Sequence, residues 1–174
     1  MMTDERRTEI CKQEVQDSAS VVILADVSGS MRGEKILRLK RELSRLWPEI
    51  TARLLAFAYD AKWCDGPDDL PEVGGRTDMR RAFEVAATVW PSEVIVISDG
   101  RPQDEAGALI AVQLIPGTIS VLFVGGDEDL AGADFMRRLA ALGGGMFAHR
   151  DLAKNLSIGG ELREMLALPA PISL

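Results

Sequence analysis

Three runs of strand length in this chain are apolar at nearly every position, and stretches of helical periodicity separate them. The runs are 21–25, 94–97 and 119–124. A strand that is apolar at every position is buried on both faces, which is typical of parallel sheets covered by helices. The alternation of such strands with helices predicts an α/β fold with a doubly wound, mostly parallel central sheet and helices on both faces.

Turn residues and apolar spacing predict the remaining elements. A strand at 54–58 is expected to turn back into a short antiparallel edge strand at 61–64, and a last short strand is expected at 146–148. Ile36, Leu39 and Leu43 keep the spacing of one buried helical stripe. Helices are expected at 34–47, from the turn at 74–77 to Pro91, at 103–114, at 131–142 and at 151–168. Trp63 and Trp90 are expected to pack in the interior. The strand order expected for this fold is 3-2-1-4-5-6.

The length of 174 residues fits one domain with a sizeable core. We expect a polar N-terminal extension at 1–18, able to form a short helix, then the domain at 19–168 and a C-terminal tail at 169–174.

The composition excludes several classes of protein. A net charge of −7 argues against binding to nucleic acid or to an anionic membrane surface, because both demand basic residues. No apolar run reaches the ~20 residues that span a bilayer, and the charged N-terminus shows no signal peptide. We therefore expect a cytoplasmic protein with Cys11 and Cys64 as reduced thiols. Two cysteines and one histidine are too few for a structural zinc site, so any bound metal must use oxygen ligands.

The loop after the first strand carries the sequence Asp26-Val27-Ser28-Gly29-Ser30. A carboxylate and two hydroxyls that leave one strand end together suit a small divalent cation such as Mg²⁺. These residue types also form ordinary turns between a strand and a helix. The pentapeptide alone does not separate these two interpretations.

Two other segments add oxygen groups at the same edge of the predicted sheet. Asp99 follows the strand at 94–97, and Thr77 lies in a loop before a helix. In the order 3-2-1-4-5-6 the first and fourth strands are neighbours, and ligands bind beyond their carboxyl ends. The sequence therefore predicts a Mg²⁺ site formed by Asp26, Ser28, Ser30, Thr77 and Asp99.

These residues resemble the metal-ion-dependent adhesion site of the von Willebrand factor A domain. The family pattern is D-x-S-x-S after the first strand, a Thr on a later loop and Asp-Gly after the fourth strand, and residues 20–167 share it. Arg76, between the glycine pair and Thr77, departs slightly from the pattern. The resemblance implies that Ser28 and Ser30 bind the ion directly, that Thr77 joins them in the ligand-competent state, and that Asp26 and Asp99 act through water.

The resemblance also implies a function. It implies a non-enzymatic, Mg²⁺-dependent protein-binding module, with Mn²⁺ and Ca²⁺ as alternative ions, that engages an Asp or Glu of a partner protein. Family members of this kind serve as intracellular adaptors beside AAA⁺ ATPases or in stress responses. Met31, Arg32, Arg76 and Asp78 border the loops and are predicted partner contacts. Arg32 also fits a solvated side chain, and Asp78 a carboxylate at a helix N-terminus.

Two alternatives remain open at this point. The first is a Mg²⁺-dependent phosphohydrolase, which is disfavoured because the motifs contain no histidine or lysine and no second aspartate two residues after Asp26. The second is a scaffold that binds through its acidic surface without metal. The acidic runs 65–69 and 127–129 are expected to be solvated loops, and His149 a surface or locally bonded side chain.

Overall fold

The computed structural model describes residues 20–154 and 157–169 of the chain. Within this part, six strands form one sheet in the order β3-β2-β1-β4-β5-β6. All neighbouring strands pair in parallel except β2 and β3, which form an antiparallel hairpin at one edge. The predicted α/β class, strand order and antiparallel edge strand are confirmed.

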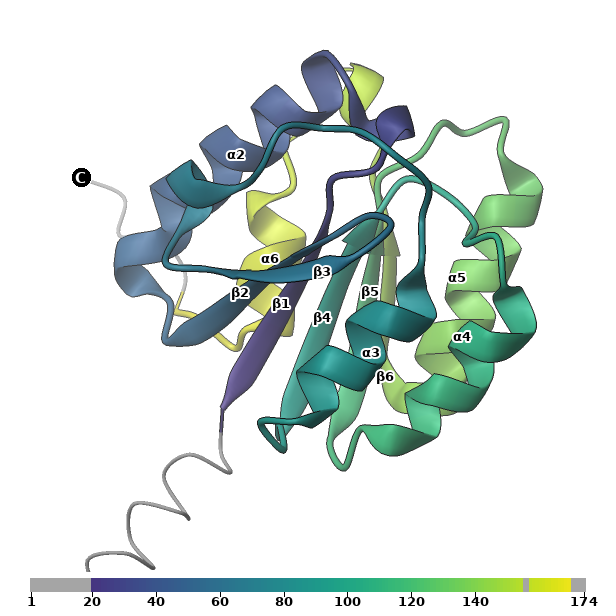
Figure 1. Cartoon of the computed structure of the whole chain (residues 1–174). Coiled ribbons are helices and arrows are strands. Elements are labelled where there is room, and N and C mark those ends of the chain that lie inside the picture. Colours follow the sequence, from purple (N-terminus) through teal and green to yellow (C-terminus); the bar gives the residue numbers. More distant parts are fainter. Residues whose placement is uncertain (1–19, 155–156, 170–174) are drawn as a thin grey trace, which may run out of the picture.

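The strands are short, and helices cover both faces of the sheet (Figure 1). Their bounds are β1 Val21–Asp26, β2 Ala52–Phe57, β3 Ala61–Cys64, β4 Glu93–Ser98, β5 Thr118–Phe123 and β6 Gly144–His149. The α-helices are α2 Glu34–Leu46, α3 Met79–Ala87, α4 Glu105–Ala111, α5 Leu130–Gly143 and α6 Gly159–Met165. Single turns of 3-10 helix lie at Gly29–Met31, Trp47–Glu49, Pro67–Asp69, Val112–Leu114 and Leu152–Lys154.

Two hydrophobic cores lie on opposite faces of the sheet because successive side chains of a strand point to opposite faces. In β1, Val22 and Leu24 join the core that contains residues of α3, α4 and α5. Ile23 and Ala25 join the core that contains residues of α2 and α6. Both faces of the central strands are thus covered, which explains why these strands are apolar at every position.

The predicted helices are present, but several are shorter than expected. Asp78 caps α3 by accepting a hydrogen bond from the Arg81 backbone N–H at 3.0 Å, so the helix begins at Met79. The helix ends at Ala87 instead of running on to Pro91. The segment predicted as one helix at 151–168 contains the 3-10 turn at Leu152–Lys154 and the short helix α6.

The early end of α3 makes the prediction for Trp90 wrong. Trp90 lies three residues beyond the helix with a φ of 50°, so it leaves the buried stripe, and 68% of its surface is exposed. Trp63 is half-buried and packs against the core, with the Arg53 guanidinium 4.3 Å from its ring centroid. The predicted N-terminal extension at 1–18, Cys11 and most of the predicted tail lie outside the described residues.

None of the described helices is long and apolar enough to cross a membrane. Two predicted solvated features also agree with the structure. The carboxylate residues of the run 65–69 are exposed on the loop that follows β3. His149 is half-buried, and its Nε2 lies 2.9 Å from the Gly125 carbonyl oxygen.

Candidate functional site

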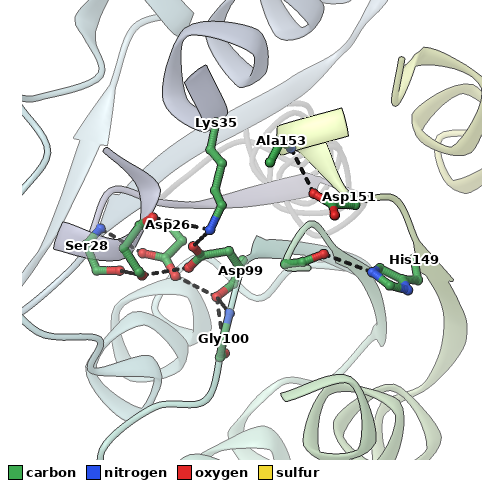
Figure 2. Close-up of polar contacts among 11 residues, drawn as sticks. Asp26, Ser28, Lys35, Asp99, Gly100, His149, Asp151 and Ala153 are labelled. Carbon is green, nitrogen blue, oxygen red and sulfur yellow. Dashed lines mark hydrogen bonds and ion pairs between the residues drawn. The ribbon is translucent and has the colours of Figure 1, made fainter. Parts of the chain in front are cut away.

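The predicted site residues lie where β1 and β4 end side by side. Ala25 pairs with Ile97 across these two parallel strands, so the next residues of each strand leave the sheet at the same edge. Asp26 is the last residue of β1, and Asp99 directly follows the last residue of β4. Their side chains point toward each other in the close-up view (Figure 2).

Asp26 is fully buried, and both of its carboxylate oxygens accept hydrogen bonds. The Ser28 backbone N–H donates to Oδ1 at 2.7 Å, and the Ser98 hydroxyl donates to Oδ2 at 2.5 Å. Burial raises the pKa of Asp26 to about 6, although the hydrogen bonds from Ser28 and Ser98 oppose that rise. Asp26 therefore fixes the start of the loop and is closed to solvent.

A chain of hydroxyls connects this loop to Asp99. The Oγ atoms of Ser28 and Ser30 lie 3.1 Å apart, and the Ser30 hydroxyl donates to Asp99 Oδ1 at 2.7 Å. Ser28 is buried, whereas Ser30 is exposed, so the chain runs from the interior to the surface. The structure thus brings four of the five predicted metal-site residues into one hydrogen-bonded cluster.

Thr77 lies on the adjoining loop, but its hydroxyl makes no hydrogen bond to the other four site side chains, all of which the structure describes. Backbone hydrogen bonds join the two loops. The Gly29 N–H donates to the Gly75 carbonyl at 3.0 Å, and the Gly74 N–H donates to the Val27 carbonyl at 2.9 Å. Gly75 has a φ of 76°, a left-handed conformation that favours glycine, so the approach of this loop depends on it.

Lys35 is a site residue that sequence reasoning missed. Its ammonium nitrogen lies 2.5 Å from Asp99 Oδ2 and 3.4 Å from the Ser30 carbonyl oxygen (Figure 2). Lys35 stands in the first turn of α2, two residues after Gly33, where the helix turns back over the loop. The sequence signal was a lysine five residues after Ser30, but only the direction of α2 shows that it reaches Asp99.

Ser98 was also missed. It ends a strand that is otherwise apolar from Val94 to Ile97, and it is fully buried. A buried hydroxyl needs a hydrogen-bond partner, which could have marked Ser98 as a residue that holds another polar group. The structure shows that this group is Asp26.

The predicted partner contacts divide into two groups. Arg32 and Arg76 are exposed, and within the described chain neither guanidinium forms an ion pair. Met31 is fully buried in the core beneath α2, so its prediction as a partner contact is wrong. Asp78 is half-buried, and its carboxylate caps α3.

Tyr59 is an exposed aromatic residue on the loop beside the site. Three quarters of its surface is accessible, and its Cβ lies beside Gly75, 3.7 Å from where a Cβ on that glycine would stand. Sequence reasoning placed Tyr59 only in the turn between two strands. The exposed rim of the site therefore combines Arg32, Arg76 and Tyr59.

The oxygen groups of the cluster fit a hard divalent cation. They supply two hydroxyls and two carboxylates, and the structure already places one cationic group, the Lys35 ammonium, against Asp99. Within residues 20–154 and 157–169, no three His, Cys, Asp or Glu side chains gather as a metal-ligand group. Besides its two aspartates, the cluster offers a metal the neutral hydroxyls of Ser28 and Ser30.

A second group of polar residues lies at the carboxyl ends of β5 and β6 and is separate from the site (Figure 2). Asp151 Oδ1 accepts from the Ala153 N–H at 2.9 Å, and Lys154 pairs with Asp127. The first contact holds a local turn, and the second joins the segments that follow β5 and β6.

No protein-family model matches the chain, and no curated protein matches it. Among solved structures, the chain is similar in part to three N-terminal domains of the type V pili tip protein Mfa5 from Porphyromonas gingivalis, with a TM-score of 0.34 and 18% identity. The match covers 47% of this chain and 20% of that one, so the chain spans only a small part of its length. A similarity this low does not bear on function.

Proposed function

We propose that this chain is a von Willebrand factor A domain that binds a divalent cation, Mg²⁺ first of all, and uses it to engage an acidic residue of a partner protein. The observation that carries the proposal is the cluster of Asp26, Ser28, Ser30 and Asp99 at the neighbouring ends of β1 and β4. The same four residues carry most of the sequence resemblance to that family.

The chain's own groups suit this role. Ser28 and Ser30 would hold the ion through neutral hydroxyls. Asp99 would position the Ser30 hydroxyl by accepting its hydrogen bond, and Asp26 would fix the loop by accepting from the Ser28 N–H. Thr77 would complete the set if its loop moves toward the serines. An ion bound mainly by neutral groups keeps enough positive charge to attract a carboxylate from outside.

The rim supports an acidic partner. Arg32 and Arg76 are exposed beside the site of a chain whose net charge is −7, so an acidic partner would meet two positive side chains there. Exposed tyrosine and arginine side chains are also the types that contribute most to protein interfaces. A cytoplasmic location and an adaptor role beside an AAA⁺ ATPase or in a stress response remain predictions from the resemblance.

A phosphohydrolase is the second candidate, and Lys35 is the observation that favours it. A lysine at the site removes one of the two arguments that disfavoured this activity from the sequence. However, Asp26 is unsuited to be a nucleophile, because it is fully buried and both of its oxygens accept hydrogen bonds. We therefore favour binding over hydrolysis.

The proposal is tested by titrating MgCl₂ into the chelator-treated protein in a calorimeter. Wild type should bind one ion, whereas the Ser28→Ala/Ser30→Ala double variant should not, because it removes the two neutral ligands. Asp68→Asn is the control, since Asp68 is exposed on the acidic loop outside the cluster and should leave binding unchanged. Equal heats from wild type and the double variant would contradict the proposed site.

Two further measurements separate the alternatives. Hydrolysis of p-nitrophenyl phosphate with Mg²⁺ that disappears in the Ser28→Ala/Ser30→Ala variant would favour the phosphohydrolase. Partner capture from lysate that EDTA leaves unchanged would favour the metal-independent scaffold. The binding module predicts no turnover and capture that EDTA abolishes.

A further inference from the structure

We propose that Lys35 is a built-in competitor of the divalent ion, so that its ammonium group occupies Asp99 in the metal-free protein and must leave when the metal binds. This inference rests on the proposed metal site, and it adds a second state to that site. The metal-free state is closed by an internal ion pair, and the metal-bound state releases a lysine toward the rim.

Lys35 and Ser30 bind the two oxygens of the Asp99 carboxylate. Asp99 Oδ2 lies 2.5 Å from the Lys35 nitrogen, and Asp99 Oδ1 accepts from the Ser30 hydroxyl at 2.7 Å. The Asp99 side chain is 1% exposed, so the chain itself satisfies both oxygens in a setting nearly closed to water. Lys35 also donates to the Ser30 carbonyl, which ties the ammonium to the same loop.

Lys35 stands at a position in its helix that is unfavourable for a cation. A cation in the first turn of a helix is disfavoured by the partial positive charge at the helix N-terminus. Lys35 nevertheless stands in the first turn of α2 and points its ammonium back toward the loop. Asp99 compensates for this placement, so the lysine is stabilised by its contact with the site and not by its position in the helix.

A metal ion bound at the serines and the Lys35 ammonium would repel each other. An ion held by Ser28 and Ser30 would lie beside the ammonium, because Ser30 contacts both Ser28 and Asp99 and its carbonyl binds Lys35. Two cations at such short range repel strongly in a partly buried setting. The Lys35 side chain is 24% exposed and has a flexible stem, so it can swing out to solvent. Metal binding and the Lys35–Asp99 ion pair therefore oppose each other.

The consequence is a metal affinity lower than the oxygen groups alone would give. Removal of the ammonium should strengthen metal binding, because the metal then no longer has to break the Lys35–Asp99 ion pair. We expect Lys35→Met to bind Mg²⁺ about tenfold more tightly than wild type.

The experiment is calorimetric titration of MgCl₂ into wild type, Lys35→Met and Lys35→Gln, with Mn²⁺ electron paramagnetic resonance as a second readout of the free ion. Lys40→Met is the matched control. Lys40 lies on the same helix, is also half-buried and donates to the Leu70 carbonyl, so the variant removes one positive charge from α2 away from the site. Its metal affinity should stay within about twofold of wild type, because only long-range, screened charge changes.

Thermal unfolding supplies the second measurement. In EDTA, Lys35→Met and Lys35→Gln should melt at a lower temperature than wild type, because Asp99 loses its cation. On addition of Mg²⁺ both variants should gain more in melting temperature than wild type gains. Either substitution suffices if the other prevents folding.

The outcomes separate this inference from the proposed function. Tighter binding by the Lys35 variants, including binding by them alone, supports the competitor. Binding equal to or weaker than wild type overturns the competitor and leaves the metal site standing. The absence of binding in wild type and in both Lys35 variants overturns the inference together with the metal site.

Discussion

The hydrogen bond between Ser98 and Asp26 gives the sharpest prediction about the metal-free protein. The Ser98 hydroxyl donates to Asp26 Oδ2 at 2.5 Å, and both residues are fully buried. A hydrogen bond to a charged group contributes about 1.5–3 kcal/mol, and one between neutral groups about 1 kcal/mol. Ser98→Ala should therefore lower the free energy of unfolding by about 2 kcal/mol at pH 8, where Asp26 is ionised, but by about 1 kcal/mol at pH 4.5.

The assay is urea denaturation in EDTA at the two pH values, followed by circular dichroism. Ser92→Ala is the control, because Ser92 is an exposed serine just before β4, and the change should stay within about 0.5 kcal/mol. The Asp26→Asn background should remove the pH dependence of the Ser98→Ala effect. An equal loss at both pH values, or a larger loss at pH 4.5, would refute the assignment of Ser98 as the donor that holds a charged Asp26.

Three further predictions concern the same region. Burial raises the pKa of Asp26 from 3.8 to about 6, so the folded state holds this proton more tightly than the unfolded state does. In EDTA the wild-type free energy of unfolding should fall by about 2 kcal/mol relative to Asp26→Asn as the pH rises from 4 to 6. A constant difference between the two proteins in urea denaturation would contradict this. Gly75→Ala should lower the free energy of unfolding by about 1 kcal/mol and weaken Mg²⁺ binding in the calorimeter, because φ is 76° at this residue. Gly74→Ala should do neither, because a Cβ there would stand in open space. Equal effects of the two substitutions would be evidence against the loop's role. Tyr59→Ala should reduce EDTA-sensitive partner capture without changing metal affinity. Trp90→Ala should leave capture unchanged, because Trp90 is an exposed aromatic that precedes β4, at the other end of that strand from the site. Unchanged capture by Tyr59→Ala would remove Tyr59 from the rim.

The sequence was sufficient to predict the sheet and the meeting of its two aspartates. Strands buried on both faces must be apolar at every position, so β1, β4 and β5 were visible without a structure. The order of a doubly wound sheet then makes β1 and β4 neighbours, which brings Asp26 and Asp99 to one edge. The antiparallel pairing of β3 also followed from the short turn at Tyr59-Asp60.

The sequence was not sufficient where a side chain's role depends on the direction of a helix or on its exact end. Met31 follows the serine loop directly, but a 3-10 turn at Gly29–Met31 rotates it into the core. Trp90 has the spacing of the α3 stripe, but the helix ends before it. Lys35 reaches Asp99 only because α2 passes back over the loop, and no local spacing encodes that contact.

Anomalous diffraction from a crystal grown with MnCl₂ would locate a divalent ion held by Ser28 and Ser30. One anomalous peak should lie among the Ser28 and Ser30 hydroxyls and the Asp99 carboxylate, with the Lys35 ammonium no longer against Asp99. No peak at this edge of the sheet in crystals saturated with Mn²⁺, with the Lys35–Asp99 ion pair intact, would contradict it.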